Sequence, residues 1–340
     1  MPFIQEILGC KSISVVGLEK NTGKTECLNY ILRRLPSSGL TVAVSSAGTD
    51  GERVDMVTGT SKPEIFLREG ILFSTSEKYY RERRLTSEIL SVSRKGTSTG
   101  RIVTARVLTG GKILLSGHPA TEDLKKWIED VSVSHGADLS IIDGALSRLS
   151  IASPAVTEGM VLATGAALSA SMDTLVRKTA YTASLIAIPA TEIRIDKRGD
   201  MPSRGLWRVE NDGTMNALEH ESSLTAGSIL PEEVKGAAAI YASGAVTDRF
   251  LNQMQTLLVK EGIQLIVRDF TRIFASQGHF NSFIRSGGVI KVVNRSKLIA
   301  ICANPVSPEG FILDSSKLCG LLGDATGLPV YDIMKSDYEA

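Results

Sequence analysis

Short runs of apolar residues alternate along the chain with longer segments in which apolar residues recur every three or four positions. Residues 12–16 form the first run, and residues 24–35 follow with apolar side chains at helical spacing. The alternation continues through residues 40–44, 121–135 and 139–142. Strands that alternate with helices in this way are typical of a parallel sheet covered by helices on both faces. We therefore predict an α/β fold with a mainly parallel sheet.

Two glycine-containing stretches interrupt the alternation and predict antiparallel hairpins. The first hairpin is centred on Gly110-Gly111 and the second on Asn211-Asp212-Gly213, which are typical turn sequences between strands. Their strands are expected at residues 101–108, 112–116, 205–210 and 214–218. The first hairpin would be an insertion into the α/β pattern.

The segment between the first strand and the first helix has the sequence of a phosphate-binding loop. It reads Gly17-Leu-Glu-Lys-Asn-Thr-Gly-Lys-Thr25. Glycine lets the backbone approach a polyphosphate, and the free N–H groups at the start of the helix point toward the anion. Lys24 would contact the β- and γ-phosphates, and the Thr25 hydroxyl would ligate Mg²⁺. The residues expected to bind the nucleotide are Gly17, Lys20, Asn21, Thr22, Gly23, Lys24, Thr25 and Glu26.

A magnesium–nucleotide site also needs an acidic side chain at the end of a neighbouring strand. Asp143 follows the apolar run of residues 139–142, at a strand end that would face the phosphates. The alternative is a carboxylate that serves only as a turn or cap residue. We expect Asp143 to bind the metal ion and, with Lys24, to act in catalysis. Asp50 is a second candidate metal ligand, although an ordinary Asp-Gly turn explains it equally well.

The length of 340 residues predicts two domains or one large α/β domain. The polar run of residues 191–204 and the second hairpin suggest the boundary. We expect a nucleotide-binding domain at residues 1–190, a linker with the hairpin at 191–234, and a smaller α/β domain at 235–340. The last domain either stands apart or extends the first sheet.

Composition narrows the possible functions. The chain has 38 basic and 37 acidic side chains, a balance that argues against a nucleic-acid partner. No uninterrupted apolar run approaches about 18 residues, so no membrane span is expected. The four cysteines show no metal-binding spacing, and the first residues lack a signal-peptide pattern. We expect a cytoplasmic protein with reduced cysteines.

The loop spacing carries a family resemblance. Five residues separate Gly17 from Gly23, and this spacing resembles the loop of dethiobiotin synthetase and related P-loop enzymes. Some members of that class place a signature lysine five residues before the loop lysine, where this chain has Glu19 followed by Lys20. The sequence Asp143-Gly-Ala also resembles the turn that supplies a metal-binding carboxylate in dethiobiotin synthetase.

A second resemblance covers more of the chain. The motifs that carry it are the loop, SIIDGALSRLS (140–150), VLATGAALS (161–169), YASGAVTD (241–248), ANPVSPEG (303–310) and GLPVYDIM (327–334). They resemble the P-loop subunit associated with the reactivase of adenosylcobalamin-dependent lysine 5,6- and ornithine aminomutases. This resemblance implies ATP-driven release of damaged cobalamin, with a second ATPase subunit and the B12-dependent aminomutase as partners.

Three functions therefore remain open at the level of sequence. The first is an ATPase that drives reactivation, with ATP and Mg²⁺ as cofactors. The second is an ATP-dependent ligase of the dethiobiotin synthetase type, and the third is a scaffold subunit that binds nucleotide without hydrolysing it. The chain contains no Asn-Lys-x-Asp run that would favour guanine, so we expect adenine.

Overall fold

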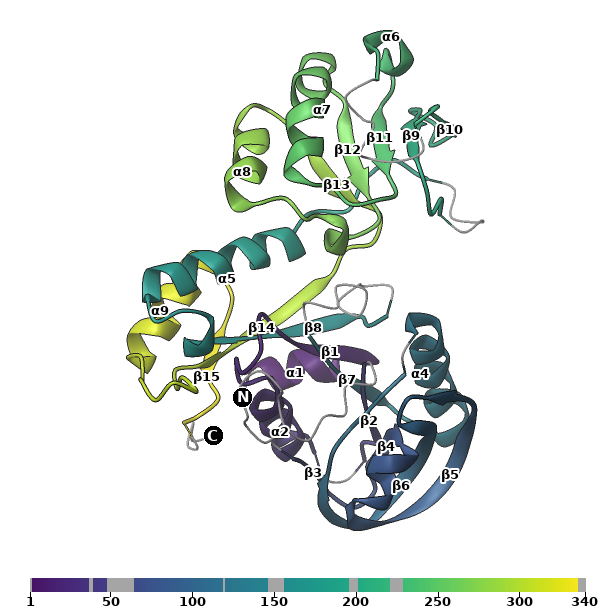
Figure 1. Cartoon of the computed structure of the whole chain (residues 1–340), viewed down its shortest axis with the longest axis vertical. Helices are drawn as coiled ribbons and strands as arrows, with labels where there is room; N and C mark the ends of the chain where they lie inside the picture. The colour runs from purple at the N-terminus through teal and green to yellow at the C-terminus, as the bar shows by residue number, and fades with distance from the viewer. Residues whose placement is uncertain are drawn as a thin grey trace. The chain divides into compact units, whose positions relative to one another are not determined.

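The computed structural model describes residues 2–36, 39–47, 64–118, 120–145, 156–195, 201–220 and 229–335. The chain forms two compact units, Met1–Ala180 with Lys297–Ala340, and Tyr181–Ser296 (Figure 1). The first unit contains a sheet with ten described strands, and the second a sheet with five. Asp143 and the predicted phosphate-binding loop both belong to the first unit.

The central part of the first sheet is parallel and runs in the order β15-β14-β8-β1-β7-β2-β4. These strands are β1 (Ser12–Gly17), β2 (Val42–Ser46), β4 (Leu72–Ser76), β7 (Leu139–Ala145), β8 (Gly159–Gly165), β14 (Lys297–Asn304) and β15 (Val330–Asp332). From β1 the chain first builds the side of β2 and β4, and from β8 onward it builds the opposite side. Such a reversal next to β1 leaves a place for a ligand at the carboxyl ends of the central strands.

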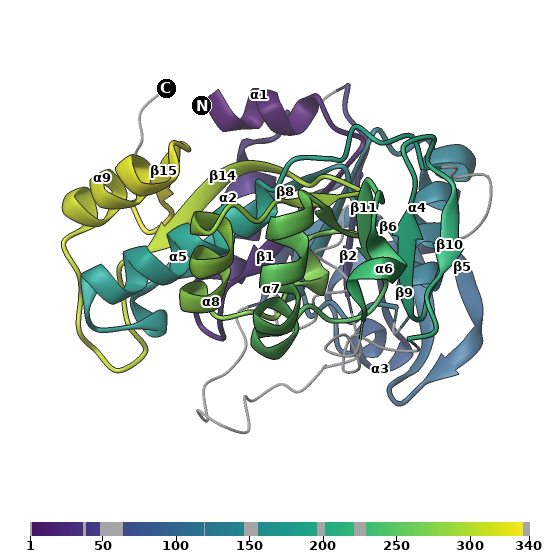
Figure 2. The same cartoon turned by 90° about the horizontal axis from the view of Figure 1, so that it is seen from above.

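Helices cover both faces of the first sheet, which confirms the predicted α/β fold. They are α1 (Pro2–Leu8), α2 (Lys24–Arg34), α4 (Thr121–His135), the first part of α5 (Met172–Ile186), α9 (Ser315–Thr326) and the short 3-10 helix η1 (Ala166–Leu168). The last residues of α5, from Tyr181 onward, belong to the second unit. Apolar residues of α1 and α2 pack with Val15 and Cys302 on one face. Residues of α9 and the start of α5 pack with Ala303, which follows Cys302 and so points to the other face. Figure 2 shows α9 beside β15.

An antiparallel insertion extends the sheet beyond β4. It consists of β3 (Ile65–Leu67), α3 (Glu77–Arg81), β5 (Arg84–Thr97) and β6 (Gly100–Ile113). The predicted turn at Gly110-Gly111 is wrong, because β6 runs through both glycines and the hairpin turns at residues 98–99. A Cβ atom on Gly111 would lie 1.9 Å from the carbonyl oxygen of Arg84. The glycine therefore permits close approach of β5, and it does not make a turn.

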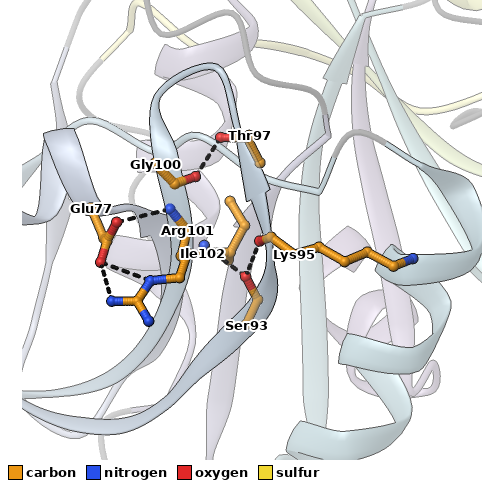
Figure 3. A network of polar contacts seen from close by, with 7 residues as sticks. All are labelled: Glu77, Ser93, Lys95, Thr97, Gly100, Arg101 and Ile102. Carbon is orange, nitrogen blue, oxygen red and sulfur yellow. Dashed lines mark hydrogen bonds and ion pairs between the residues drawn. The ribbon is translucent and has the colours of Figure 1, made fainter.

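Polar contacts fix the tip of this hairpin to α3 (Figure 3). The Glu77 carboxylate accepts hydrogen bonds from the backbone N–H of Arg101 at 3.0 Å and from its guanidinium at 2.8 and 3.1 Å. These bonds hold the pKa of Glu77 below its usual value. Lys95 points away from them and donates to Asp123 of α4 at 2.8 Å. The hairpin is thus tied to helices on both sides.

The second unit has the strand order β10-β9-β11-β12-β13. Its elements are β9 (Leu206–Val209), β10 (Met215–Ala217), α6 (Pro231–Val234), β11 (Ala239–Ala242), α7 (Asp248–Glu261), β12 (Gln264–Val267), the 3-10 helix η3 (Phe270–Arg272), α8 (Gln277–Arg285) and β13 (Ile290–Val292). The predicted second hairpin is confirmed: β9 and β10 pair antiparallel, with Gly213 at φ 89° in their connection.

The units differ from the predicted domains in two ways. The segment 191–234 is not a linker throughout, since β9 pairs with β11 inside the second sheet. The range 235–340 is divided, because β14 pairs with β8 and so returns to the first sheet. The side chains of Ile301, Cys302 and Ala303 are fully buried there. An apolar run of this kind predicts a strand but does not specify which sheet it joins.

Candidate functional site

The loop of residues 17–25 has the local geometry that its sequence predicts. It leaves β1 at Gly17 and folds back on itself, with the Thr22 hydroxyl donating to the Glu19 carbonyl at 2.8 Å. A Cβ atom on Gly17 would lie 2.9 Å from that hydroxyl oxygen. Asn21 and Gly23 adopt left-handed φ values of 61° and 86°. The loop is therefore a tight turn that needs small or permissive residues at these positions.

Helix α2 begins directly after this turn, at Lys24. Its N-cap residue, Gly23, has no side chain that could bond to the first N–H groups, which carry the partial positive charge of the helix dipole. Lys24, Thr25 and Glu26 are partly exposed in the first turn, whereas Cys27 is buried beneath it. The start of α2 thus combines backbone donors with a lysine and a hydroxyl, the groups that bind phosphate and its metal ion.

Asp143 lies at the carboxyl end of β7, beside the loop. Its backbone is in register with Val15 of β1 on one side and Ser46 of β2 on the other. Lys24 Nζ and Asp143 Oδ1 are 3.0 Å apart, and the lysine side chain is 26% exposed against 12% for the aspartate. The structure therefore brings together the two residues predicted to act in catalysis.

The Asp143 carboxylate is incompletely satisfied. Oδ1 is buried, and no described residue, Lys24 included, meets it with hydrogen-bond geometry. A buried polar atom without a hydrogen bond is rare in native proteins and often marks a place for a bound ion or water. Among the described residues, no group of three or more histidine, cysteine, aspartate or glutamate side chains is placed to hold a metal ion.

Asp143 and Thr25 nevertheless fit Mg²⁺ as it binds with a nucleotide. In such sites one or two protein oxygens suffice, because phosphate oxygens and waters complete the shell. A carboxylate and a hydroxyl are the donors that Mg²⁺ prefers. Asp50, the second predicted metal ligand, lies outside the described residues.

Residues far along the chain complete the surroundings of the loop. A Cβ atom on Gly23 would lie 2.8 Å from Cβ of Asn304 and 2.9 Å from Cδ1 of Ile333. The Asn304 side chain accepts a hydrogen bond from the Val306 N–H at 3.0 Å, which fixes the turn after β14. The sequence does not predict that these residues lie at the loop, because no short-range pattern reports contacts between residues 281 and 310 positions apart.

The thiols near the site are not candidates for nucleophilic chemistry. Cys27 and Cys302 are free and fully buried. Burial raises the pKa of the Cys27 thiol well above its usual value, and its hydrogen bond with Cys302 acts in the same direction. A thiol without ready access to the thiolate form is a poor nucleophile.

Comparisons with known proteins do not assign the chain to a family. No protein-family model matches the chain, and neither curated proteins nor solved structures give a match. Among the described residues, no helix combines the length and apolar composition needed to cross a lipid bilayer.

Proposed function

We propose that this chain is a P-loop NTPase that binds a magnesium–nucleotide at the carboxyl ends of β1 and β7 and hydrolyses it, with ATP as the nucleotide. The observation that carries the proposal is the meeting of Lys24 with Asp143 at the open start of α2, 3.0 Å apart. Neither residue type is unusual alone. Together with the tight loop and the parallel sheet, they match the phosphate-binding and metal-binding groups that P-loop enzymes use in phosphoryl transfer.

Each group has a distinct part in this proposal. The N–H groups of residues 22–25 and the Lys24 ammonium would hold the β- and γ-phosphates. Asp143 and the Thr25 hydroxyl would hold Mg²⁺, which when bound neutralises charge on the phosphate oxygens. Catalysis by such a site consists mainly of positioning and charge stabilisation, so no side-chain nucleophile is needed.

The ion pair between Lys24 and Asp143 also indicates how the site would respond to its ligand. Lys24 must turn from the carboxylate to the phosphates when the nucleotide binds. Asp143 then has an unpaired negative charge, which a divalent cation can neutralise. The nucleotide draws Lys24 away from Asp143, and the metal ion takes the place of Lys24 beside the carboxylate. Nucleotide and metal binding should therefore favour each other.

We further propose that ATP turnover serves to reactivate a B12-dependent aminomutase. This part of the proposal rests on the motifs that resemble the reactivase-associated P-loop subunit. ATP binding and release would shift a docking surface between two states and so drive the release of damaged cobalamin. A second ATPase subunit and the mutase are the proposed partners, in the cytoplasm.

Phosphate release from Mg·ATP tests these proposals in two steps. The purified chain is assayed alone, and then with the proteins that co-purify with it from native extract in the presence and absence of ATP. Turnover that rises when a B12-dependent mutase co-purifies supports the proposal. Turnover that needs only a small metabolite supports a ligase instead, and nucleotide affinity without any turnover supports a scaffold.

A further inference from the structure

Several hydroxyl side chains gather at the carboxyl ends of β2 and β4, next to the proposed nucleotide site. Most of them already have partners: Ser45 Oγ lies 2.6 Å from Ser74 Oγ, and Thr75 Oγ1 donates to the Leu114 carbonyl at 2.9 Å. The hydroxyls of Ser46 and Ser76 make no hydrogen bond with any described residue, and of these two serines only Ser46 is half-buried, whereas Ser76 is fully buried. Because it is half-buried, the Ser46 hydroxyl remains accessible to a ligand at this edge of the sheet.

Ser46 and Asp143 occupy the same place on neighbouring strands. The two residues are directly opposite in the parallel ladder of β2 and β7, so their side chains leave the same face of the sheet. The backbone N–H of Ala47 donates to the Asp143 carbonyl at 2.8 Å, which fixes this register at the strand end. Neighbouring strands are about 4.8 Å apart, so a water molecule bound beside Asp143 can reach the Ser46 hydroxyl.

The Ser46 backbone is also held from the other side. A Cβ atom on Gly117 would lie 1.2 Å from the Ser46 carbonyl oxygen, so the chain passes directly over it. The backbone of Ser46 is therefore fixed at this strand end, so that only rotation of its side chain about χ1 would be lost on binding a ligand. The position of Ser46, its partial exposure and the lack of a hydrogen-bond partner for its hydroxyl among the described residues thus point to the same role.

We propose that Ser46 is a further binding residue of the nucleotide site, whose hydroxyl holds a water in the coordination shell of the nucleotide-bound Mg²⁺. This inference rests on the proposed function. Mg²⁺ usually keeps several waters, and groups that hydrogen-bond to its ligands orient them. A hydroxyl can accept a hydrogen bond from such a water, and it brings no extra charge to a shell already containing Asp143.

The test measures metal binding directly. Mn²⁺ replaces Mg²⁺ in an electron paramagnetic resonance titration, with a non-hydrolysable ATP analogue at saturation. Ser46→Ala should raise the apparent Kd for Mn²⁺ about tenfold. Affinity for the analogue without metal should change by less than about twofold, because Ser46 is assigned to the metal-bound water and not to the phosphates.

Two further variants make the result specific. Ser46→Thr keeps the hydroxyl and should restore Mn²⁺ affinity. Ser45→Ala changes the adjacent serine, which points to the opposite face and bonds to Ser74, so Mn²⁺ affinity should stay at the wild-type value. Unchanged Mn²⁺ affinity in Ser46→Ala, or an equal loss in Ser45→Ala, would overturn the inference while leaving the nucleotide site intact. Absence of analogue binding in the wild-type protein would instead overturn the proposed function, and this inference with it.

Discussion

Replacing Asp143 with asparagine removes one negative charge from the site and preserves the volume of the side chain. Lys24 then loses the carboxylate that lies 3.0 Å from its Nζ. The lysine is about a quarter exposed, so water can solvate the ammonium after the change. We therefore expect the free energy of unfolding to fall by no more than about 1 kcal/mol.

The effects on ATP should differ in sign: metal-free ATP should bind more tightly, whereas Mg²⁺-dependent turnover should fall. At a separation of 3.0 Å the Coulomb attraction is about 5 to 6 kcal/mol for an effective dielectric constant near 20. Desolvation and side-chain ordering offset most of it, which leaves a net value of about 1 kcal/mol. ATP no longer has to break this pair in the variant. Metal-free ATP should therefore bind about fivefold more tightly.

With Mg²⁺ the same substitution should be harmful. The metal ion loses a charged oxygen partner, and turnover should fall about a hundredfold. Calorimetric ATP titrations in EDTA and in Mg²⁺, combined with a phosphate-release assay, measure both effects. Asp138→Asn is the matched control, because Asp138 precedes the same strand and accepts a hydrogen bond from the Thr41 N–H. If Asp143→Asn turns over Mg·ATP at the wild-type rate, the reasoning about this carboxylate is refuted.

Three other predictions follow from particular contacts. Thr25→Ala should also reduce Mg²⁺-dependent turnover, and its effect should not add to that of Asp143→Asn; additive losses would mean that the two groups do not share one ion. Burial lowers the pKa of His118 to about 4, below the unfolded value near 6.5, so protonation favours the unfolded chain and stability falls as pH drops through this window. Between pH 7 and pH 5, the free energy of unfolding measured in urea should fall by about 2 kcal/mol less in His118→Gln than in the wild type. Equal losses in the two proteins would contradict the assignment. Gly111→Ala places a methyl group 1.9 Å from a facing carbonyl oxygen and should cost about 2 to 3 kcal/mol, whereas Gly96→Ala meets nothing within 4 Å and should cost clearly less in the same thermal-unfolding assay.

Features that depend on neighbouring residues could be predicted from the sequence. The loop of residues 17–25 lies between a strand and a helix because its apolar neighbours switch from the spacing of a strand to that of a helix. Asp143 could be placed at a strand end by the same reasoning, and its ion pair with Lys24 agrees with that prediction. The turn at Gly213 was also predictable, since Asn-Asp-Gly tolerates a left-handed φ.

Features that depend on long-range pairing could not be predicted. Glycines at a hairpin turn and glycines at a close strand contact look alike in sequence. The prediction of a turn at Gly110-Gly111 was wrong for this reason. The return of β14 to the first sheet is decided by packing against β8, which lies more than 100 residues earlier. Ser46 is one of two adjacent serines, and only the strand register distinguishes the one that faces the site.

ATP binding to the wild-type chain and to Lys24→Ala tests the central claim most directly. Isothermal titration with Mg·ATP gives the two dissociation constants, and circular dichroism checks that the variant is folded. Lys24 is partly exposed and supplies charge to the phosphates, so the fold should persist while affinity falls by about a hundredfold or more. Equal ATP affinity in the two folded proteins would contradict the proposed nucleotide site.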